Sequence, residues 1–432
     1  MVKLFFVKSG IVFYKISQNA MLVILTCFFY SSLPAQDVPN PLTKKIDGDT
    51  SQESLYYLYY KNQMDLIDLA YIILRKDRLK RLDSTGIKNT KFYVTLAPVV
   101  EFTTATGFSP GIAGNVAFLT SIKEQTNTSS ILGAIKYTQK KQFLFPVQSS
   151  IWTPGNRFNL LGDWRYFNYP QDAFGFGGHT ELSDKYIIDY KYIRFYESVQ
   201  KRIGNNWYAG IGYQLDYHWQ INEQGVQPPE RITDFQKYGF STASTSSGIA
   251  INLLYDAREN SINPSAGSFY ANAQLVVDRT FLGASSNWSR IIIDVRKYLK
   301  MPLKTVLALW CFSMLNVRGD PPYLDLPGTG ADTYNNTGRG YEQARFIGQN
   351  MVDLEAELRF NITKNGLLGA VIFGNAETVS ELGTNRFEVI SPAFGVGLRI
   401  KFNKFSNTNT CIDFGVGTKG SHGFVGNLGE AF

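Results

Sequence analysis

The chain has few of the residues on which most enzyme and metal chemistry depends. Its 432 residues include three cysteines and three histidines. Cys311 and Cys411 are far apart and the histidines are isolated, so the sequence indicates no zinc, haem or thiol site. It also contains no G-x-S-x-G motif, and the glycines within 175–178 have the wrong spacing for a phosphate-binding loop. We therefore predict neither an enzymatic activity nor a cofactor.

Long apolar runs and clusters of like charge are also scarce. Lysine and arginine are scattered among aspartate and glutamate, with a formal net charge of +7, so no nucleic-acid-binding surface is indicated. The apolar run Met21–Ala35 is shorter than the ~20 residues that a helix needs to cross a bilayer. Lysines precede this run, and Leu33–Ala35 resembles a small-residue cleavage site. Residues 1–35 are therefore predicted to be a signal peptide, with a transmembrane anchor as the alternative.

Aromatic residues and glycine, by contrast, are abundant. There are 31 Phe, 25 Tyr and 38 Gly, a composition typical of many β-strands joined by tight turns. Residues 36–90 differ, and we predict that they form a periplasmic linker with one amphipathic helix within 60–82. Basic residues gather at the C-terminal end of this helix, where the helix dipole favours them. We expect its apolar face to pack on the rest of the protein; a membrane-surface helix is the alternative. The apolar face comprises Leu66, Leu69, Ala70, Ile73 and Leu74.

From residue 91 onward the apolar residues recur with a period of two. In the stretch WYAGIGYQLDYHW, residues 207–219, aromatic and aliphatic side chains share one face, whereas Gln214, Asp216 and His218 share the other. A soluble β-sandwich also alternates, but its strands are usually shorter. Long strands with aromatic residues near their ends are typical of a transmembrane barrel with lipid outside and a polar lumen inside.

The sequence thus predicts an all-β protein. We expect residues 91–432 to form a transmembrane antiparallel β-barrel of about 16 strands in the outer membrane of a Gram-negative-type cell. Short turns alternate with longer loops, notably 220–239 and 318–349, as expected when one barrel end faces the periplasm and the other the exterior. The expected strands lie at 92–101, 109–121, 129–138, 142–152, 157–167, 186–202, 206–219, 240–256, 267–279, 286–299, 304–317, 350–362, 366–376, 387–402, 408–417 and 423–432.

One stretch, GRGYEQARFIGQNMVDLEAELRF, places an arginine between two glycines just before an alternating strand. Three acidic residues of that strand, Glu357 among them, would face the lumen together with Arg359. Burying so many charges is costly unless they are paired. Arg339 supplies a planar cation suited to carboxylates, and Gly338 and Gly340 let the backbone turn tightly around it. We therefore predict that the 318–349 loop folds into the barrel and docks Arg339 on Glu357 or a neighbour.

This stretch resembles the loop-six motif of the BamA/TamA superfamily of outer-membrane barrels, the bacterial surface antigen family. The family motif is (V/I)RG(F/Y), followed by a strand that ends in E-L-R. The next strand usually carries an acid where this chain has Asn375, so the resemblance implies one charged and one neutral acceptor for the arginine. Gly338 also departs from the usual branched aliphatic residue. The matching positions are Gly338, Arg339, Gly340 and Tyr341 in the loop, with Glu357 and Arg359 in the strand.

Further matches extend the resemblance over residues 91–432. The segment YDARENSINPSAGSFY resembles the family's hairpin motif, APVVEFTTATGFSPGIAG its opening segment, and DAFGFGGHT its glycine-rich loop. The terminal Phe432 lies on the same face as Phe424 and Leu428 of the last expected strand and matches the outer-membrane assembly signal. The hairpin positions are Asp256, Arg258, Asn260, Pro264 and Gly267.

The resemblance implies a protein that assists assembly, insertion or translocation of proteins or lipids at the outer membrane. Its clients would be unfolded outer-membrane proteins, and its route a lateral seam between strands 92–101 and 423–432, which Gly426 and Gly429 would loosen. The alternative is a pore or an accessory subunit, because residues 36–90 are too few for even one ordinary POTRA domain. A periplasmic partner would then bind the 60–82 helix. Luminal cations would bias a pore toward anions, namely Arg290, Arg296, Arg399 and Lys401.

Overall fold

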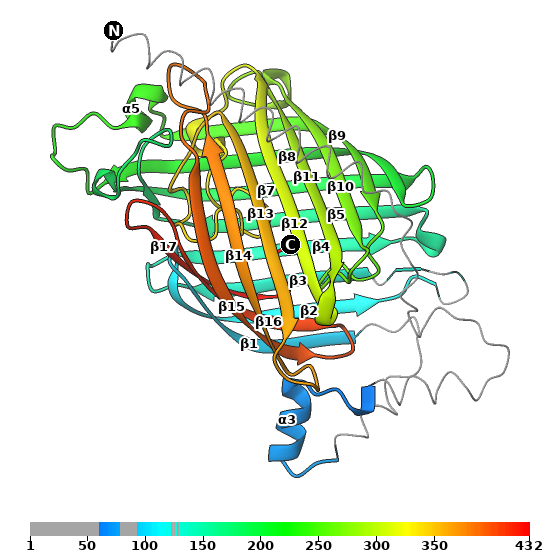
Figure 1. Cartoon of the computed structure of the whole chain (residues 1–432). Coiled ribbons are helices and arrows are strands. Elements are labelled where there is room, and N and C mark those ends of the chain that lie inside the picture. The colour runs from blue at the N-terminus through cyan, green and yellow to red at the C-terminus, as the bar shows by residue number, and fades with distance from the viewer. Residues whose placement is uncertain (1–59, 78–92, 122–123, 125, 128) are drawn as a thin grey trace, which may run out of the picture. The chain divides into compact units, whose positions relative to one another are not determined.

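The computed structural model describes residues 60–77, 93–121, 124, 126–127 and 129–432. Its β-strands form one sheet of 17, which curves into a barrel (Figure 1). Strand β6 (Gln171–Ala173) has three residues and pairs only with β7, so the barrel wall consists of the other 16 strands. These are β1 (Tyr93–Thr103), β2 (Gly107–Phe118), β3 (Ser129–Tyr137), β4 (Phe143–Trp152), β5 (Phe158–Asn168), β7 (Tyr186–Arg202), β8 (Trp207–Gln224), β9 (Ala243–Asp256), β10 (Phe269–Asp278), β11 (Trp288–Met301), β12 (Thr305–Arg318), β13 (Asn350–Asn361), β14 (Leu368–Val379), β15 (Ser391–Asn403), β16 (Thr408–Val416) and β17 (His422–Leu428).

The predicted all-β fold is confirmed, because each expected strand overlaps one strand of the wall. The side-chain period of two is the reason. In β8, Ile211 is 61% exposed on the outer face, whereas Asp216 is 2% exposed on the inner face. Consecutive wall strands pair antiparallel from β1–β2 to β16–β17.

The strand connections differ in length between the two barrel ends. At one end, which we call the short-turn end, the chain reverses at residues 203–206, 302–304, 362–367 and 404–407. The opposite, long-loop end carries residues 225–242, with helix α5 (Asp234–Gly239), and residues 319–349. Strand β8 ends at Gln224, beyond its predicted end at residue 219, and its alternation breaks at Gln220, where φ is +55° and the pairing with β7 shifts register.

The last strand is shorter than predicted. It ends at Leu428, and Gly429 then adopts a φ of +100°, a conformation that redirects the chain. Residues 429–432 leave the wall and enter the barrel interior, where Phe432 is 2% exposed and its ring lies 5.0 Å from that of Trp310. The prediction that Phe432 lies on the same face as Phe424 and Leu428 is therefore wrong, since Leu428 is 63% exposed.

The N-terminal helix is also shorter than predicted. Helix α3 spans Leu66–Ile73, and no basic residue lies in its last turn. Residues 74–77 follow it without helical structure, and residues 78–82 lie outside the described part of the chain. The expected packing is reversed, since Asp65 and Asp68 are buried whereas Ile73 is 78% exposed. Within the described residues, no helix is long and apolar enough to span a membrane.

Candidate functional site

The 319–349 loop, which connects β12 to β13, enters the barrel and turns at two glycines. Gly338 has a φ of +70° and Gly340 a φ of +110°, values that other residues rarely adopt. Space is restricted as well: a Cβ at Gly338 would lie 2.3 Å from Glu377 Oε2, and one at Gly340 would lie 2.7 Å from Ala393 Cβ. Glycine at both positions therefore allows the loop to bring Arg339 against the inner face of the wall.

The Arg339 side chain is 1% exposed and contacts three carboxylates. Nη2 donates to Glu357 Oε2 at 2.6 Å and also to Glu355, while Nη1 donates to Asp413 Oδ2 at 2.6 Å. The guanidinium carbon lies 3.9 Å from the ring centroid of Phe373, within range of a cation–π interaction. Arg339 thus joins β13 to β16 from inside the barrel.

Two further arginines extend this group. Arg359 Nε donates to the second Glu357 oxygen at 2.6 Å. Arg399 Nη1 donates to Asp413, and its Nε donates to Glu430 Oε2 at 2.7 Å. We call this set the arginine cluster: three arginines and four carboxylates, all with side chains at most 9% exposed. Its members are Arg339, Arg359, Arg399, Glu355, Glu357, Asp413 and Glu430.

The arginine cluster also holds residues 430–432. Arg359 Nη2 donates to the main-chain oxygen of Phe432 at 2.9 Å, and Asn336 of the inward loop donates to the Ala431 carbonyl at 2.9 Å. Glu430 in the same segment bonds Arg399. Loop, cluster and residues 429–432 therefore form one connected interior.

Asn375 and Tyr341 hold the loop in ways the sequence did not indicate. The Asn375 side chain donates from Nδ2 to the Arg339 carbonyl at 2.7 Å, so it bonds the backbone instead of accepting from the guanidinium. The Tyr341 hydroxyl donates to the Pro392 carbonyl at 2.7 Å and accepts from the Thr418 amide at 3.0 Å. Both contacts fix the loop backbone at the wall.

The glycine-rich loop of residues 172–180 secures the outer part of the inward loop. Arg345 donates to the side chain and carbonyl of Thr180 at 2.7 and 2.8 Å. The Gly177 amide donates to the Ile347 carbonyl at 2.8 Å. The inward loop is thus held at both its tip and its base.

The hairpin motif lies at the short-turn end, where its Ile262 carbonyl accepts from the Glu430 amide at 3.2 Å. Arg258 forms a two-pronged ion pair with Asp256, with Nε–Oδ1 and Nη2–Oδ2 distances of 2.9 and 2.8 Å. Asn260 donates to a carbonyl of the turn between β15 and β16 at 2.9 Å. Pro264 is buried, and Gly267 has a φ of +94°. These contacts give the hairpin a structural role.

The arginines proposed to line a pore all have acidic partners. Arg290 lies 3.8 Å from Asp216, and Arg296 donates to both oxygens of Asp294 at 2.8 and 2.6 Å. Arg399 belongs to the arginine cluster. These three side chains therefore do not form the free cationic lining that the sequence suggested.

The sequence-based prediction did not include Asp413 or Glu430 among the partners of the arginines. The alternation TCIDFGV already places Asp413 on the inner face, which was the available signal. Nothing in the local sequence indicates that Glu430 turns inward after Leu428.

The wall is incompletely closed between its first and last strands, β1 and β17. All 11 residues of β1 pair with β2, and all seven residues of β17 pair with β16. Within the described residues, no ladder joins β1 to β17. The Thr104 amide donates to the Phe424 carbonyl at 3.2 Å, and the rings of Phe102 and Phe424 lie 5.2 Å apart. We call this boundary the seam; its hydrogen bonds among the described residues join Thr104, in the turn after β1, to the amide and carbonyl of Phe424.

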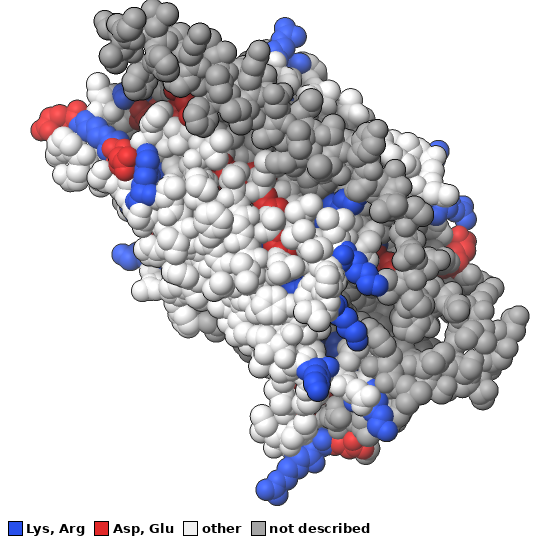
Figure 2. Space-filling view, in the orientation of Figure 1, with Lys and Arg blue, Asp and Glu red and all other residues white. Residues whose placement is uncertain are grey.

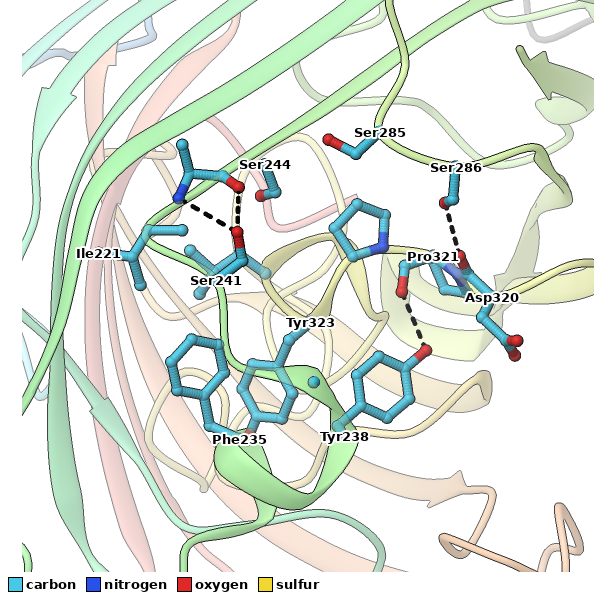
Figure 3. A pocket seen from close by; sticks show the side chains of 14 residues that line it. Ile221, Phe235, Tyr238, Ser241, Ser244, Ser285, Ser286, Asp320, Pro321 and Tyr323 are labelled. Carbon is cyan, nitrogen blue, oxygen red and sulfur yellow. Dashed lines mark hydrogen bonds between the residues drawn. The ribbon is translucent and has the colours of Figure 1, made fainter. Parts of the chain in front are cut away.

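A separate cavity of about 260 Å³ lies at the long-loop end, between α5 and the start of the inward loop (Figure 3). Three of its hydroxyl groups, those of Tyr238, Ser241 and Ser286, bond within the wall of the cavity. Tyr238 donates to the Pro321 carbonyl at 2.9 Å, and Ser286 to the Asp320 carbonyl at 2.8 Å. The cavity therefore marks where the outer loops join. In the part of the chain that the structure describes, no group of three or more His, Cys, Asp or Glu side chains is arranged so that it could hold a metal ion.

Comparison with solved structures identifies the same kind of barrel. The chain resembles BamA from Haemophilus ducreyi lacking POTRA domains 1–3, with a TM-score of 0.53 and 13% identity over 79% of this chain and 70% of that one. It also resembles CdiB from Escherichia coli, with a TM-score of 0.51 and 8% identity over 78% of this chain and 62% of that one. Comparisons with protein families and with curated proteins find no match.

At these identities the similarity shows the fold: a 16-stranded barrel of the BamA and CdiB kind. This fold indicates the bacterial outer membrane. The signal peptide predicted for residues 1–35 lies outside the described residues.

Proposed function

We propose that the protein assists the assembly, insertion or translocation of proteins or lipids at the outer membrane, with the seam as the route. The observation that carries this proposal is the edge of β1, which has no ladder partner on the β17 side. An unpaired strand edge offers a row of amide and carbonyl groups to another chain. A client strand can add to such an edge through main-chain hydrogen bonds.

The arginine cluster makes the two sides of the seam unequal. It connects β13, β15, β16 and the segment after β17 through buried ion pairs. Strand β1 contributes no residue to these pairs. We infer that the β17 side is held in place and that opening moves the β1 side, where a client would pair.

A pore is the competing function. It would need an open path through the lumen, and its proposed arginines are ion-paired. The inward loop and residues 429–432 also occupy the interior. The seam is therefore the better supported route.

A cross-link across the seam tests the proposal. Phe102→Cys and Phe424→Cys, in a Cys27→Ser background, would be joined with a reducible bis-methanethiosulfonate reagent; native Cys311 and Cys411 are buried. The barrel would be reconstituted in liposomes, and folding of a urea-unfolded outer-membrane protein followed by protease protection. We expect the unlinked barrel to accelerate folding, the cross-link to abolish the acceleration, and reduction to restore it.

The matched control joins two strands that are already paired. Ile112 and Ile135 are register partners in β2 and β3 and are both exposed, so Ile112→Cys with Ile135→Cys adds the same cross-link away from the seam. It should leave the acceleration unchanged. Acceleration that survives the seam cross-link would contradict the route, and a folded, unlinked barrel that accelerates nothing would contradict the function.

A further inference from the structure

Helix α3 is attached to the barrel by its polar side. Asp65 caps the helix by accepting from the Asp68 amide at 2.7 Å, and its other oxygen accepts from the Lys404 amide at 2.9 Å. Lys404 Nζ donates to Asp68 Oδ2 at 2.8 Å, with both side chains at most 1% exposed. The buried ion pair fixes the helix at the turn between β15 and β16.

This attachment leaves the aliphatic end of α3 without cover. Ile72, Ile73 and Leu74 are 49%, 78% and 64% exposed. Arg75 and Lys76 follow directly and are also exposed. A three-residue aliphatic group beside two cations is thus presented outward from the short-turn end of the barrel.

The short turns of the wall carry the same pairing of side chains. Ile203 is exposed after Arg202, and Leu303 is 94% exposed beside Lys304. In the β13–β14 turn, Ile362 is exposed close to Lys364. Figure 2 shows lysine and arginine gathered toward this end, whereas much of the described wall in that view is uncharged.

A hydrogen bond joins the residue before α3 to one of these turns. The Met64 amide, just before α3, donates to the Asn365 carbonyl in the β13–β14 turn at 3.1 Å. Ile362 in that turn adjoins the outward face of β13, which faces lipid in a barrel of this kind. The start of α3 therefore lies beside a surface that borders the membrane, and its aliphatic end lies one helix length, ~12 Å, further along.

We propose that α3 is an interfacial anchor that lies on the periplasmic leaflet of the outer membrane and binds anionic phospholipid headgroups. Short turns face the periplasm in bacterial barrels. Helices of this kind bury their apolar side chains ~5–10 Å into the boundary between headgroups and acyl chains. Ile72, Ile73 and Leu74 would enter this boundary, and Arg75 and Lys76 would meet lipid phosphates. The proposal concerns a surface distinct from the seam and does not depend on the proposed function.

A lipid surface fits the patch better than a protein partner. A stable protein interface buries ~800 Å² on each side, more than three aliphatic side chains on one short helix provide. Lipid needs no complementary shape and already contacts the neighbouring wall. The cations also match the anionic charge of phosphatidylglycerol.

A fluorescent label on the helix tests the anchor. The full chain with Ile73→Cys, in a Cys27→Ser background, would carry an environment-sensitive NBD group in nanodiscs containing phosphatidylglycerol. We expect a blue-shifted emission that lipids with a doxyl group near the headgroup quench more strongly than lipids labelled deep in the acyl chains. The control is Asn62→Cys, an exposed position before the helix, whose label should remain water-exposed.

A second measurement uses the unsubstituted protein. Hydrogen exchange of residues 72–76 should be slower in nanodiscs with phosphatidylglycerol than in nanodiscs of phosphatidylcholine alone. Arg75→Glu with Lys76→Glu should remove that difference without changing exchange in β13. A water-exposed label at position 73 in the phosphatidylglycerol nanodiscs, with equal exchange of residues 72–76 in both lipids, would overturn the proposal and leave a protein partner as the occupant.

Discussion

Arg339 is a single cation placed against three carboxylates, and its shape is what makes the arrangement possible. The planar guanidinium donates to Glu355, Glu357 and Asp413 from two nitrogens while its face covers Phe373. A lysine ammonium is a compact point charge that cannot reproduce this fork. Its role as a brace for the loop therefore depends on arginine specifically.

Removing that side chain should destabilise the barrel. Arg339→Ala leaves the three carboxylates with less compensating charge, and loss of one partner of a buried ion pair typically costs ~3–5 kcal/mol. We expect a lower urea midpoint and loss of heat-resistant migration on a denaturing gel. Arg339→Lys should give a urea midpoint between those of the unsubstituted protein and Arg339→Ala.

The control for this substitution is Arg318→Ala, at an exposed position at the end of β12, which should behave as the unsubstituted protein. Glu355→Gln added to Arg339→Ala removes one uncompensated charge and should restore part of the loss. Unchanged heat-modifiability of Arg339→Ala would refute the bracing role.

At the scale of elements, α3 should be separable from the barrel. Lys404→Met leaves Asp68 buried without its cation, which favours release of the helix. We expect amide exchange and proteolysis within residues 66–73 to become faster, while the heat resistance of the barrel stays the same. Amide exchange and proteolysis are measured on the folded protein in detergent, and heat resistance on the same sample by gel migration.

The neighbouring Lys401 supplies the comparison. It donates to Asn407 and forms no hydrogen bond or ion pair with the described residues of α3, so Lys401→Met should leave the helix protected. Equal protection of α3 in Lys404→Met would show that the ion pair does not hold the helix.

The elements also show how far sequence reasoning reaches. The alternating period identified each wall strand, because a barrel strand must separate lipid from lumen residue by residue. The same alternation extended the last strand to Phe432, since the pattern does not register the left-handed turn at Gly429. For α3, the periodicity revealed two faces but not which one docks, and the deciding partner, Lys404, lies hundreds of residues away in the chain.

At the scale of the whole molecule, the seam should be detectable without any substitution. Amides of β1 that do not bond to β2 face a side without a ladder, whereas strands such as β8 are paired on both sides. Amide exchange reports such local differences in stability. We expect alternate amides of β1 to exchange faster than any in β8, and uniform protection of β1 would contradict an open seam.

The interior illustrates what could not be predicted. The sequence supported the docking of an inward loop on luminal acids, and Glu357 was among the acids named. The arginine cluster, however, takes Asp413 from β16 and Glu430 from the segment after β17. Which acids meet which arginines depends on barrel curvature and strand position, neither of which is encoded in a local motif.

The interior position of the inward loop also constrains the order of folding. Its tip carries a charged side chain whose acceptors come from strands far apart in the chain, so the final contacts cannot form until β13 and β16 are both in place. Contacts of such long sequence separation form slowly, because the entropy of closing the intervening chain is lost before they are gained. We therefore expect the inward loop to dock last, inside a barrel wall that has already formed.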